Sequence, residues 1–203
     1  MITIIDYDSG NIGSIVNMIK SIGFESTVVR DSKGLDGASA IILPGVGSFD
    51  TAIEKLNKSE MFSSIINKVT INKIPILGIC LGMQLLTKGS EEGDGLKGLG
   101  LVDAHCFKFN TKGLKVPHMG WNEVHVKKNS IYFDTTIQER FYFAHSYAVT
   151  CKNKADILTT TTHGHNFTSS FLHGNVLGVQ FHPEKSHSFG KKFFESFLKD
   201  IDA

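Results

Sequence analysis

Short apolar runs alternate with amphipathic stretches through the first half of the chain. The apolar runs lack a helical period and end at polar or glycine residues, which is typical of buried strands; they cover residues 2–7, 26–30, 40–45 and 74–79. Between them, apolar side chains recur at helical spacing over residues 12–19, 48–56 and 60–71. Strands that alternate with helices predict right-handed crossovers and a parallel sheet with helices on both faces.

Two of these helices have recognisable capping residues. Gly23 follows the first helix at the position that tolerates a left-handed backbone. Ser48 or Asp50 can cap the start of the second helix with a side-chain oxygen.

The pattern changes near Gly98, after which β-rich segments separated by Gly, Asn and Lys turns predominate. They cover residues 100–109, 122–126, 140–150, 156–162, 167–173 and 175–181. We interpret them as antiparallel additions and an extension of the same sheet. A last helix has an apolar stripe of phenylalanines that is typical of core packing. Since no linker or repeat interrupts the chain, we expect one α/β domain over residues 1–203.

Composition narrows the classes of partner. The 203 residues are 41% hydrophobic and have a formal net charge of +1, which favours neither nucleic acid nor a membrane surface as a partner. No apolar stretch approaches about 18 residues and no basic region precedes the first one, so we expect a cytoplasmic protein. The three cysteines, Cys80, Cys106 and Cys151, form no CxxC pair, which argues against disulfides and structural zinc.

Cys80 lies where a predicted strand turns into a helix, in the sequence GICLG (Gly78 to Gly82). This is the form of a nucleophile elbow, in which small flanking residues avoid collisions with a strained backbone. The turn would raise the sulfur above the strand ends, at the start of the helix LGMQLLTKG, where the helix dipole favours a thiolate. The alternative is a core cysteine in a glycine-flanked turn.

His182 and Glu184 form a second candidate group in the sequence GVQFHPEKS. The proline after His182 favours an extended backbone, so that residues 182 and 184 project to the same side. A carboxylate beside an imidazole fixes its tautomer and raises its basicity, which suits a base for a cysteine nucleophile. The two groups together suggest a Cys-His-Glu triad, although a solvated histidine in a polar turn would explain this motif alone.

The segment LPGVGSF, residues 43–49, ends another strand of the parallel half. Its closely spaced glycines would let the main chain at Val46 and Gly47 point N–H groups at a developing negative charge. Together with the amide of Leu81 they could form an oxyanion hole. As a phosphate-binding loop the segment is a poor match, because it lacks the Lys-Ser/Thr of a Walker sequence.

With these motifs placed, the chain resembles the class I (triad) glutamine amidotransferases, and among them the glutaminase subunits of imidazole glycerol phosphate synthases. The resemblance runs nearly end to end through DYDSGNIGS, LPGVGSF, GICLGMQLL, VPHMGWNEV, YFAHSY and VQFHPEKS. It implies a flavodoxin-like sheet, and we expect neither a cofactor nor a metal.

The resemblance also implies roles for individual residues. Cys80 would attack the side-chain amide of L-glutamine, His182 would move protons and Glu184 would orient it. Polar ends of glutamine would be held near Gly47, Gln84, His145, Ser146 and Tyr147. The oxyanion strand would need to rearrange at Val46, so the chain alone should be nearly idle.

Ammonia would pass to a (β/α)8-barrel cyclase subunit that makes imidazole glycerol phosphate and an aminoimidazole carboxamide ribotide in histidine biosynthesis. Asn11, Trp121 and Lys185 match positions that the family uses at that heterodimer interface. An ordinary core aromatic is the alternative for Trp121, and an exposed helical glutamine is the alternative for Gln84.

Several departures from the family pattern keep other functions open. Asp8 and the histidine-rich segment TTTHGHNFTSSFLHGN leave room for a relative that supplies ammonia to a sugar-amidating enzyme of surface-polysaccharide synthesis. A cysteine peptidase-like hydrolase or a non-catalytic binding module could use the same scaffold. His163, His165 and His173 could suggest a metal site, but acidic co-ligands are not evident and surface or turn histidines are favoured.

Overall fold

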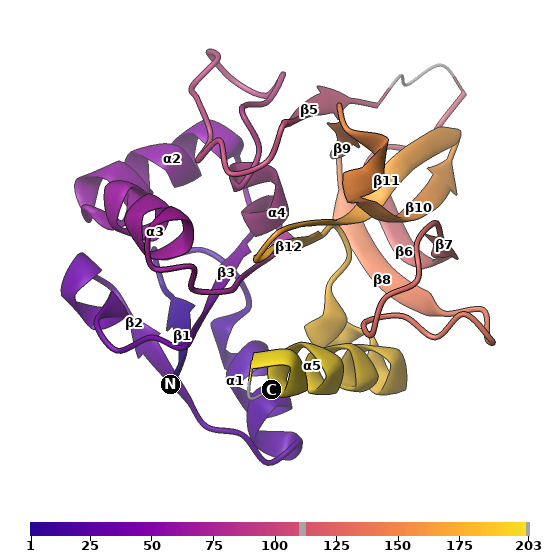
Figure 1. The fold of residues 1–203 in the computed structure, drawn as a ribbon. Helices are drawn as coiled ribbons and strands as arrows, with labels where there is room; N and C mark the ends of the chain where they lie inside the picture. Colours follow the sequence, from indigo (N-terminus) through magenta and orange to yellow (C-terminus); the bar gives the residue numbers. More distant parts are fainter. Residues whose placement is uncertain (110–112, 202–203) are drawn as a thin grey trace.

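A mixed sheet of ten strands forms the centre of the structure, a computed structural model that describes residues 1–109 and 113–201 (Figure 1). Its parallel half has the order β2-β1-β3-β4-β12. These strands are β1 (Ile2–Ile5), β2 (Ser26–Val29), β3 (Ala40–Gly45), β4 (Ile76–Cys80) and β12 (Val176–Val179). The predicted parallel strands are thus confirmed, and β12, which lies far along the chain, pairs with β4.

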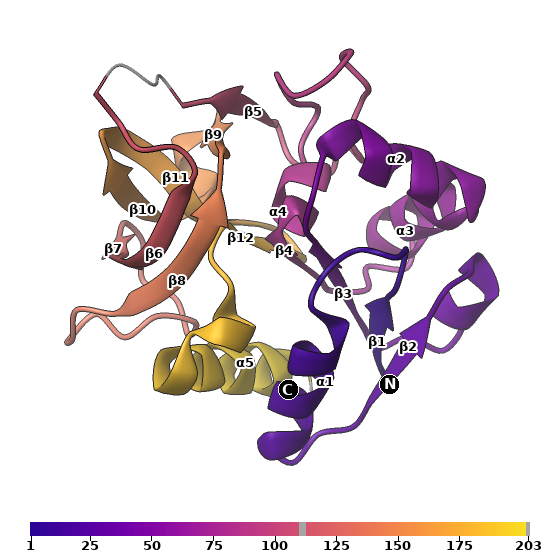
Figure 2. The same cartoon turned by 180° about the vertical axis from the view of Figure 1, so that it is seen from behind.

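Helices cover both faces of the parallel half (Figures 1 and 2). One face carries α2 (Phe49–Lys58), α3 (Met61–Thr70) and the short α4 (Leu81–Leu85), and the other carries α1 (Ile12–Ser21) and α5 (His187–Ile201). Alternate side chains of β3 enter the two cores: Ile41 and Leu43 pack under α2 and α3, while Ile42 packs under α1 and α5. This confirms the predicted α/β architecture.

The second half adds antiparallel strands to the same sheet. They are β5 (Ala104–Lys108), β7 (His125–Val126), β9 (Tyr147–Cys151), β10 (Ile157–His163) and β11 (His165–His173). A separate two-stranded sheet pairs β6 (His118–Glu123) with β8 (Arg140–His145). Short 3-10 helices cover Ser32–Leu35, Lys154–Asp156 and Pro183–Lys185. In the part of the chain that is described, no helix has the length and apolar character needed to cross a membrane.

Two predicted segments differ from the structure for identifiable reasons. The expected continuous strand over residues 140–150 is interrupted at Ser146, because β8 pairs with β6 while β9 pairs with β5 and β11. The helix after Cys80 ends at Leu85 instead of running to residue 89. The Thr87 hydroxyl donates to the Gln84 carbonyl and the Lys88 amide pairs with Ala104, which draws the chain toward β5.

The helix ends give one confirmation and one correction. Gly23 has a φ of +89°, and the amides of Gly23 and Phe24 donate to the last carbonyls of α1, as in a Schellman motif. Ser48 does occupy the N-cap position of α2, but its hydroxyl donates to Thr51. The carboxylate of Glu92 accepts from the Phe49 amide at 3.0 Å and caps the helix instead.

Candidate active site

The backbone at Cys80 has the strained conformation that the elbow prediction requires. Its φ of +54° lies in the left-handed region, which side chains other than glycine rarely adopt. A Cβ atom at Gly82 would overlap the Leu43 carbonyl, and one at Gly78 would lie 2.7 Å from the Gly82 carbonyl. The two glycines therefore let β3, β4 and α4 close around the cysteine.

His182 and Glu184 meet at the same edge of the sheet. The imidazole Nδ1 lies 2.8 Å from Glu184 Oε1, and both side chains are buried. The His182 amide donates to the Tyr142 carbonyl, while the Ser186 hydroxyl donates to the His182 carbonyl. The main chain of His182 is thus anchored to β8. Its Nδ1 is hydrogen-bonded to Glu184, and its Nε2 is the nitrogen that can interact with Cys80.

Cys80 and Glu184 together set the charge of His182. Burial lowers the pKa of the imidazole, but attraction to the Cys80 sulfur and to the Glu184 carboxylate outweighs it and raises the pKa to about 10. An imidazole with a raised pKa keeps its proton at neutral pH. The arrangement therefore favours an imidazolium beside the cysteine.

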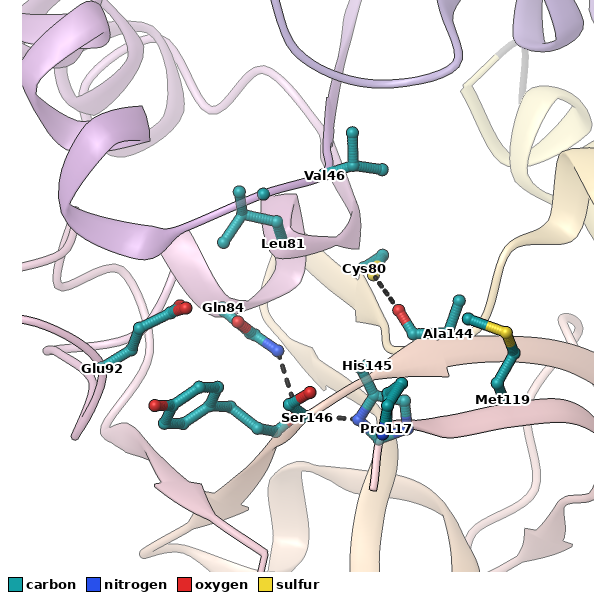
Figure 3. Close-up of a pocket in the computed structure, with 12 residues that line it drawn as sticks. Val46, Cys80, Leu81, Gln84, Glu92, Pro117, Met119, Ala144, His145 and Ser146 are labelled. Carbon is teal, nitrogen blue, oxygen red and sulfur yellow. Dashed lines mark hydrogen bonds between the residues drawn. The ribbon is translucent and has the colours of Figure 1, made fainter. Parts of the chain in front are cut away.

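A cavity of about 210 Å³ opens beside Cys80 (Figure 3). All eight predicted oxyanion, substrate and nucleophile residues line it: Val46, Gly47, Cys80, Leu81, Gln84, His145, Ser146 and Tyr147. Pro117, Met119, Ala144 and Glu92 complete the lining, and the sequence analysis did not single out these four residues. In Figure 3, Gln84 lies between Glu92 and Cys80.

Both polar main-chain groups of Val46 are hydrogen-bonded to Ser9, another residue that was not singled out from the sequence. The Ser9 hydroxyl accepts from the Val46 amide at 3.0 Å and donates to the Val46 carbonyl at 2.5 Å. The next residue, Gly47, has a φ of +101°. The Val46 N–H thus has an acceptor already, and it would have to leave Ser9 before it could donate to a group in the cavity.

Glu92 brings a carboxylate to the cavity. One oxygen accepts from the Phe49 amide, and burial raises the pKa of the side chain despite that hydrogen bond. In the sequence, Glu92 lies among acidic and glycine residues that look like a solvated turn, and only the fold directs it to the start of α2. The cavity therefore has the Cys80 sulfur at one end and the Glu92 carboxyl group at the other.

His145 uses both ring nitrogens within the protein. Its Nδ1 donates to the Tyr147 carbonyl at 2.7 Å, so its Nε2 must accept from His118 Nδ1 at 2.9 Å. Asn122 donates to the remaining nitrogen of His118. Burial lowers the pKa of His145 to about 3 and that of His118 to about 4, so both rings are neutral. His145 shapes the cavity wall without a free nitrogen.

Each of the three predicted interface residues is at least partly exposed. Trp121 is 42% exposed and stacks on His187 at a centroid distance of 5.5 Å, so the core-aromatic interpretation was wrong. Lys185 is exposed, with its ammonium 5.9 Å from the centroid of the Tyr142 ring. Asn11 occupies the half-buried N-cap position of α1, without a side-chain capping bond.

The three other candidate histidines fit the surface and turn interpretation. His163 and His165 flank the Gly164 turn between β10 and β11, and His173 pairs with Asp156 at 3.1 Å. Within residues 1–109 and 113–201, no group of three or more acidic, histidine or cysteine side chains could hold a metal ion. Cys106 and Cys151 are free thiols buried in the core.

Comparison with known proteins extends these observations. The profile of the family described as glutamine amidotransferase class-I matches residues 3–201. The chain is 49% identical over 201 residues to "Imidazole glycerol phosphate synthase subunit HisH 2" of Methanococcus maripaludis, covering 98% of the chain and 99% of that protein. It is 41% identical to the protein of the same name from Pseudomonas aeruginosa, with the same coverage.

Solved structures agree with the fold. A structure described as a glutamine amidotransferase superimposes with a TM-score of 0.79 at 19% identity, covering 100% of this chain and 99% of that one. The structure of PurLQS from Thermotoga maritima matches with a TM-score of 0.78 at 22% identity and 98% coverage of both chains. Sequence and fold thus point the same way: the chain belongs to the class I glutamine amidotransferases and, within them, to the family of the HisH subunits of imidazole glycerol phosphate synthase.

Proposed function

We propose that this chain hydrolyses L-glutamine to glutamate and ammonia through Cys80, His182 and Glu184, and that it delivers the ammonia to a cyclase subunit. The observation that carries the proposal is the convergence of three elements at one edge of the sheet, where Cys80 lines the cavity and His182 and Glu184 lie behind Cys80, outside the lining. The strained cysteine of β4, the buried imidazole–carboxylate pair after β12, and the glycine-flanked peptide after β3 all lie at the carboxyl edge of the parallel strands.

In the first half-reaction, the Cys80 thiolate attacks the side-chain amide carbon of glutamine and a tetrahedral oxyanion forms. The C–N bond then breaks as the His182 imidazolium gives its proton to the departing nitrogen, which leaves as ammonia. A γ-glutamyl thioester remains on the sulfur. Because its pKa is raised, His182 is protonated at neutral pH and has the proton that this step needs.

In the second half-reaction, neutral His182 takes a proton from water, whose oxygen attacks the thioester carbon. The C–S bond breaks, glutamate leaves, and the thiolate–imidazolium pair is restored. Glu184 keeps Nδ1 hydrogen-bonded throughout and so leaves Nε2 as the nitrogen that exchanges protons.

The cavity has groups that suit both ends of glutamine. The Glu92 carboxylate suits the α-ammonium group of glutamine. At the other end, the main-chain N–H of Leu81 suits the oxyanion, and the N–H of Val46 can join it once it is released from Ser9. A cavity of about 210 Å³ is smaller than the roughly 300–1,000 Å³ of pockets for drug-sized ligands. This size favours a single amino acid over a peptide, and so argues against a cysteine peptidase.

Exposed apolar side chains near the mouth of the cavity support docking of the cyclase there. Val46 is 47% exposed and Met119 64% exposed, and Trp121 lies on the same strand as Met119. Such side chains at a rim are typical of a protein–protein contact. A partner on this face would also shield ammonia from bulk water.

One observation favours a second candidate function. The names of both relatives reported above end in the numeral 2, which sets them apart from another subunit of the same name. A second copy could supply ammonia to a sugar-amidating enzyme instead of a histidine-pathway cyclase. The chemistry at Cys80 would be identical, and only the acceptor of the ammonia would differ.

An ammonia-transfer assay with the purified cognate (β/α)8-barrel cyclase and its nucleotide substrate tests the proposal. We expect glutamate release to rise greatly when both are added, with formation of imidazole glycerol phosphate. Cys80→Ala should abolish the glutamine-dependent synthesis and leave the ammonia-dependent synthesis intact, whereas Cys151→Ala, which changes a buried thiol away from the cavity, should preserve both.

Two outcomes would redirect the proposal. Glutaminase activity that the cyclase fails to stimulate, but that a sugar-amidating enzyme does stimulate, would favour the second candidate. Full glutamine-dependent synthesis by Cys80→Ala would overturn the chemistry altogether.

A further inference from the structure

Gln180 is a buried polar residue to which the proposed reaction assigns no role. It follows β12 directly, and its side chain is fully buried. Because Val179 pairs with Ile79 in the parallel register of β12 and β4, the next residues, Gln180 and Cys80, lie side by side at the strand ends. The main-chain N–H of Gln180 donates to the Ser169 carbonyl at 2.9 Å, which fixes the backbone at this point.

The side chain of Gln180 connects the nucleophile to the cavity lining. Its Nε2 donates to the Cys80 sulfur at 3.7 Å, and its Oε1 accepts from Gln84 Nε2 at 3.1 Å. A primary amide has two donors and one carbonyl acceptor, so this side chain can meet a thiolate and an N–H group at once. Its burial prevents it from touching a ligand in the cavity.

One main-chain carbonyl determines the orientation of both amides. Gln84 Nε2 donates to the Tyr147 carbonyl at 3.1 Å, and a carbonyl can only accept. The Gln84 nitrogen must therefore face both the Tyr147 carbonyl and the Gln180 side chain. The Gln180 oxygen then has to face Gln84 as the acceptor, which leaves the Gln180 nitrogen facing Cys80. With both N–H groups of Gln84 used, the group that Gln84 offers to the cavity is its carbonyl oxygen.

We propose that Gln180 is a positioning residue that holds the Cys80 thiolate and fixes the Gln84 amide with its acceptor toward substrate. The inference rests on the proposed function and adds a residue to it. The donor to sulfur favours the charged nucleophile, because hydrogen bonds to charged groups are stronger than those between neutral ones. The contact to Gln84 selects ligands that present N–H groups to this side of the cavity, as glutamine does.

Gln180→Met tests both contacts, because methionine conserves much of the volume and removes the amide. We expect the midpoint of a plot of Cys80 alkylation rate against pH, measured with iodoacetamide, to move up by about one pH unit, which makes the reaction roughly tenfold slower at pH values below the midpoint. In the cyclase complex, KM for glutamine should rise roughly tenfold as well. Ser170→Ala, which removes a buried hydroxyl from the neighbouring β11, should change neither quantity.

Gln180→Glu separates the two contacts. It keeps an oxygen for the Gln84 amide but puts a carboxyl group beside the sulfur, so the alkylation midpoint should rise while KM changes less than in Gln180→Met. This variant also serves if Gln180→Met fails to fold. An unchanged midpoint in a folded variant, or an equal shift in Ser170→Ala, would overturn the inference. Because alkylation needs neither glutamine nor a partner, its outcome is independent of whether the proposed reaction is correct.

Discussion

Removing the Ser9 hydroxyl should make the isolated chain a better glutaminase. In the structure, this hydroxyl accepts from the Val46 amide and donates to the Val46 carbonyl, so one side chain holds both polar groups of the peptides that flank Val46. The Val46 side chain is half exposed and Gly45 and Gly47 flank it, so the peptide can rotate without moving a buried side chain. Rotation would turn the Val46 N–H toward the cavity.

The two hydrogen bonds set the size of the expected effect. Each contributes about 0.5–1.5 kcal/mol net, and the lower half of this range applies because both are near the surface. Together they favour the conformation in which Val46 is bonded to Ser9 by about 1–2 kcal/mol over the rotated one, which corresponds to a roughly 5–30-fold difference in population. Ser9→Ala should therefore raise glutamate release by the chain without partner roughly 5–30-fold, while the rate of the fully activated complex changes little.

A coupled assay for glutamate without the cyclase measures this effect. Ser9→Thr, which keeps the hydroxyl, is the matched control and should behave like the unmodified chain. If Ser9→Ala keeps its thermal stability and still shows an unchanged or lower basal rate, then the Ser9 contacts do not restrain the oxyanion strand and the reasoning is wrong.

Three further predictions concern the elbow, a buried acid and the surface around the cavity. Gly82→Ala should lower the free energy of unfolding by at least about 3 kcal/mol in chemical denaturation, because its Cβ would overlap the Leu43 carbonyl; Gly13→Ala, with open space around it, should be neutral or stabilising. Burial raises the pKa of Glu139 to about 7, so the contribution of its protonated form to stability is complete below pH 4.5 and is lost as pH rises through 7. In thermal melts at pH 8, Glu139→Gln should therefore be more stable than the unmodified chain by up to about 3 kcal/mol. A gain in stability that does not grow between pH 5 and pH 8 would contradict this. Trp121→Ala should weaken binding of the cyclase in calorimetry by about 30-fold or more, whereas Ile71→Ala, also an exposed apolar residue but at the end of α3, should not.

The sequence was sufficient where the structural constraint is local. The elbow at Cys80 could be predicted because collisions within one turn demand glycine on both sides, and the pairing of His182 with Glu184 follows from their spacing beside a proline. The first strands and helices could be predicted for the same reason, since their periods of hydrophobicity are determined by their own residues.

The missed residues depend on contacts between distant parts of the chain. Gln180 meets Cys80 only because β12 pairs with β4 in a register that no single motif reveals. Ser9 and Glu92 reach the residues after β3 from a loop and a turn that look solvated in the sequence. Polar side chains of this kind have no periodic pattern, and their roles emerge only when the strand order is known.

Covalent trapping of the nucleophile tests the central claim most directly. The electrophilic glutamine analogue 6-diazo-5-oxonorleucine, added to the cyclase complex, should label the peptide that contains Cys80 and leave Cys106 and Cys151 unmodified, as read by mass spectrometry. Free L-glutamine should slow the labelling. A complex in which Cys80 remains unlabelled, or is labelled at a rate that glutamine does not change, would contradict the proposal that this cavity binds and hydrolyses glutamine.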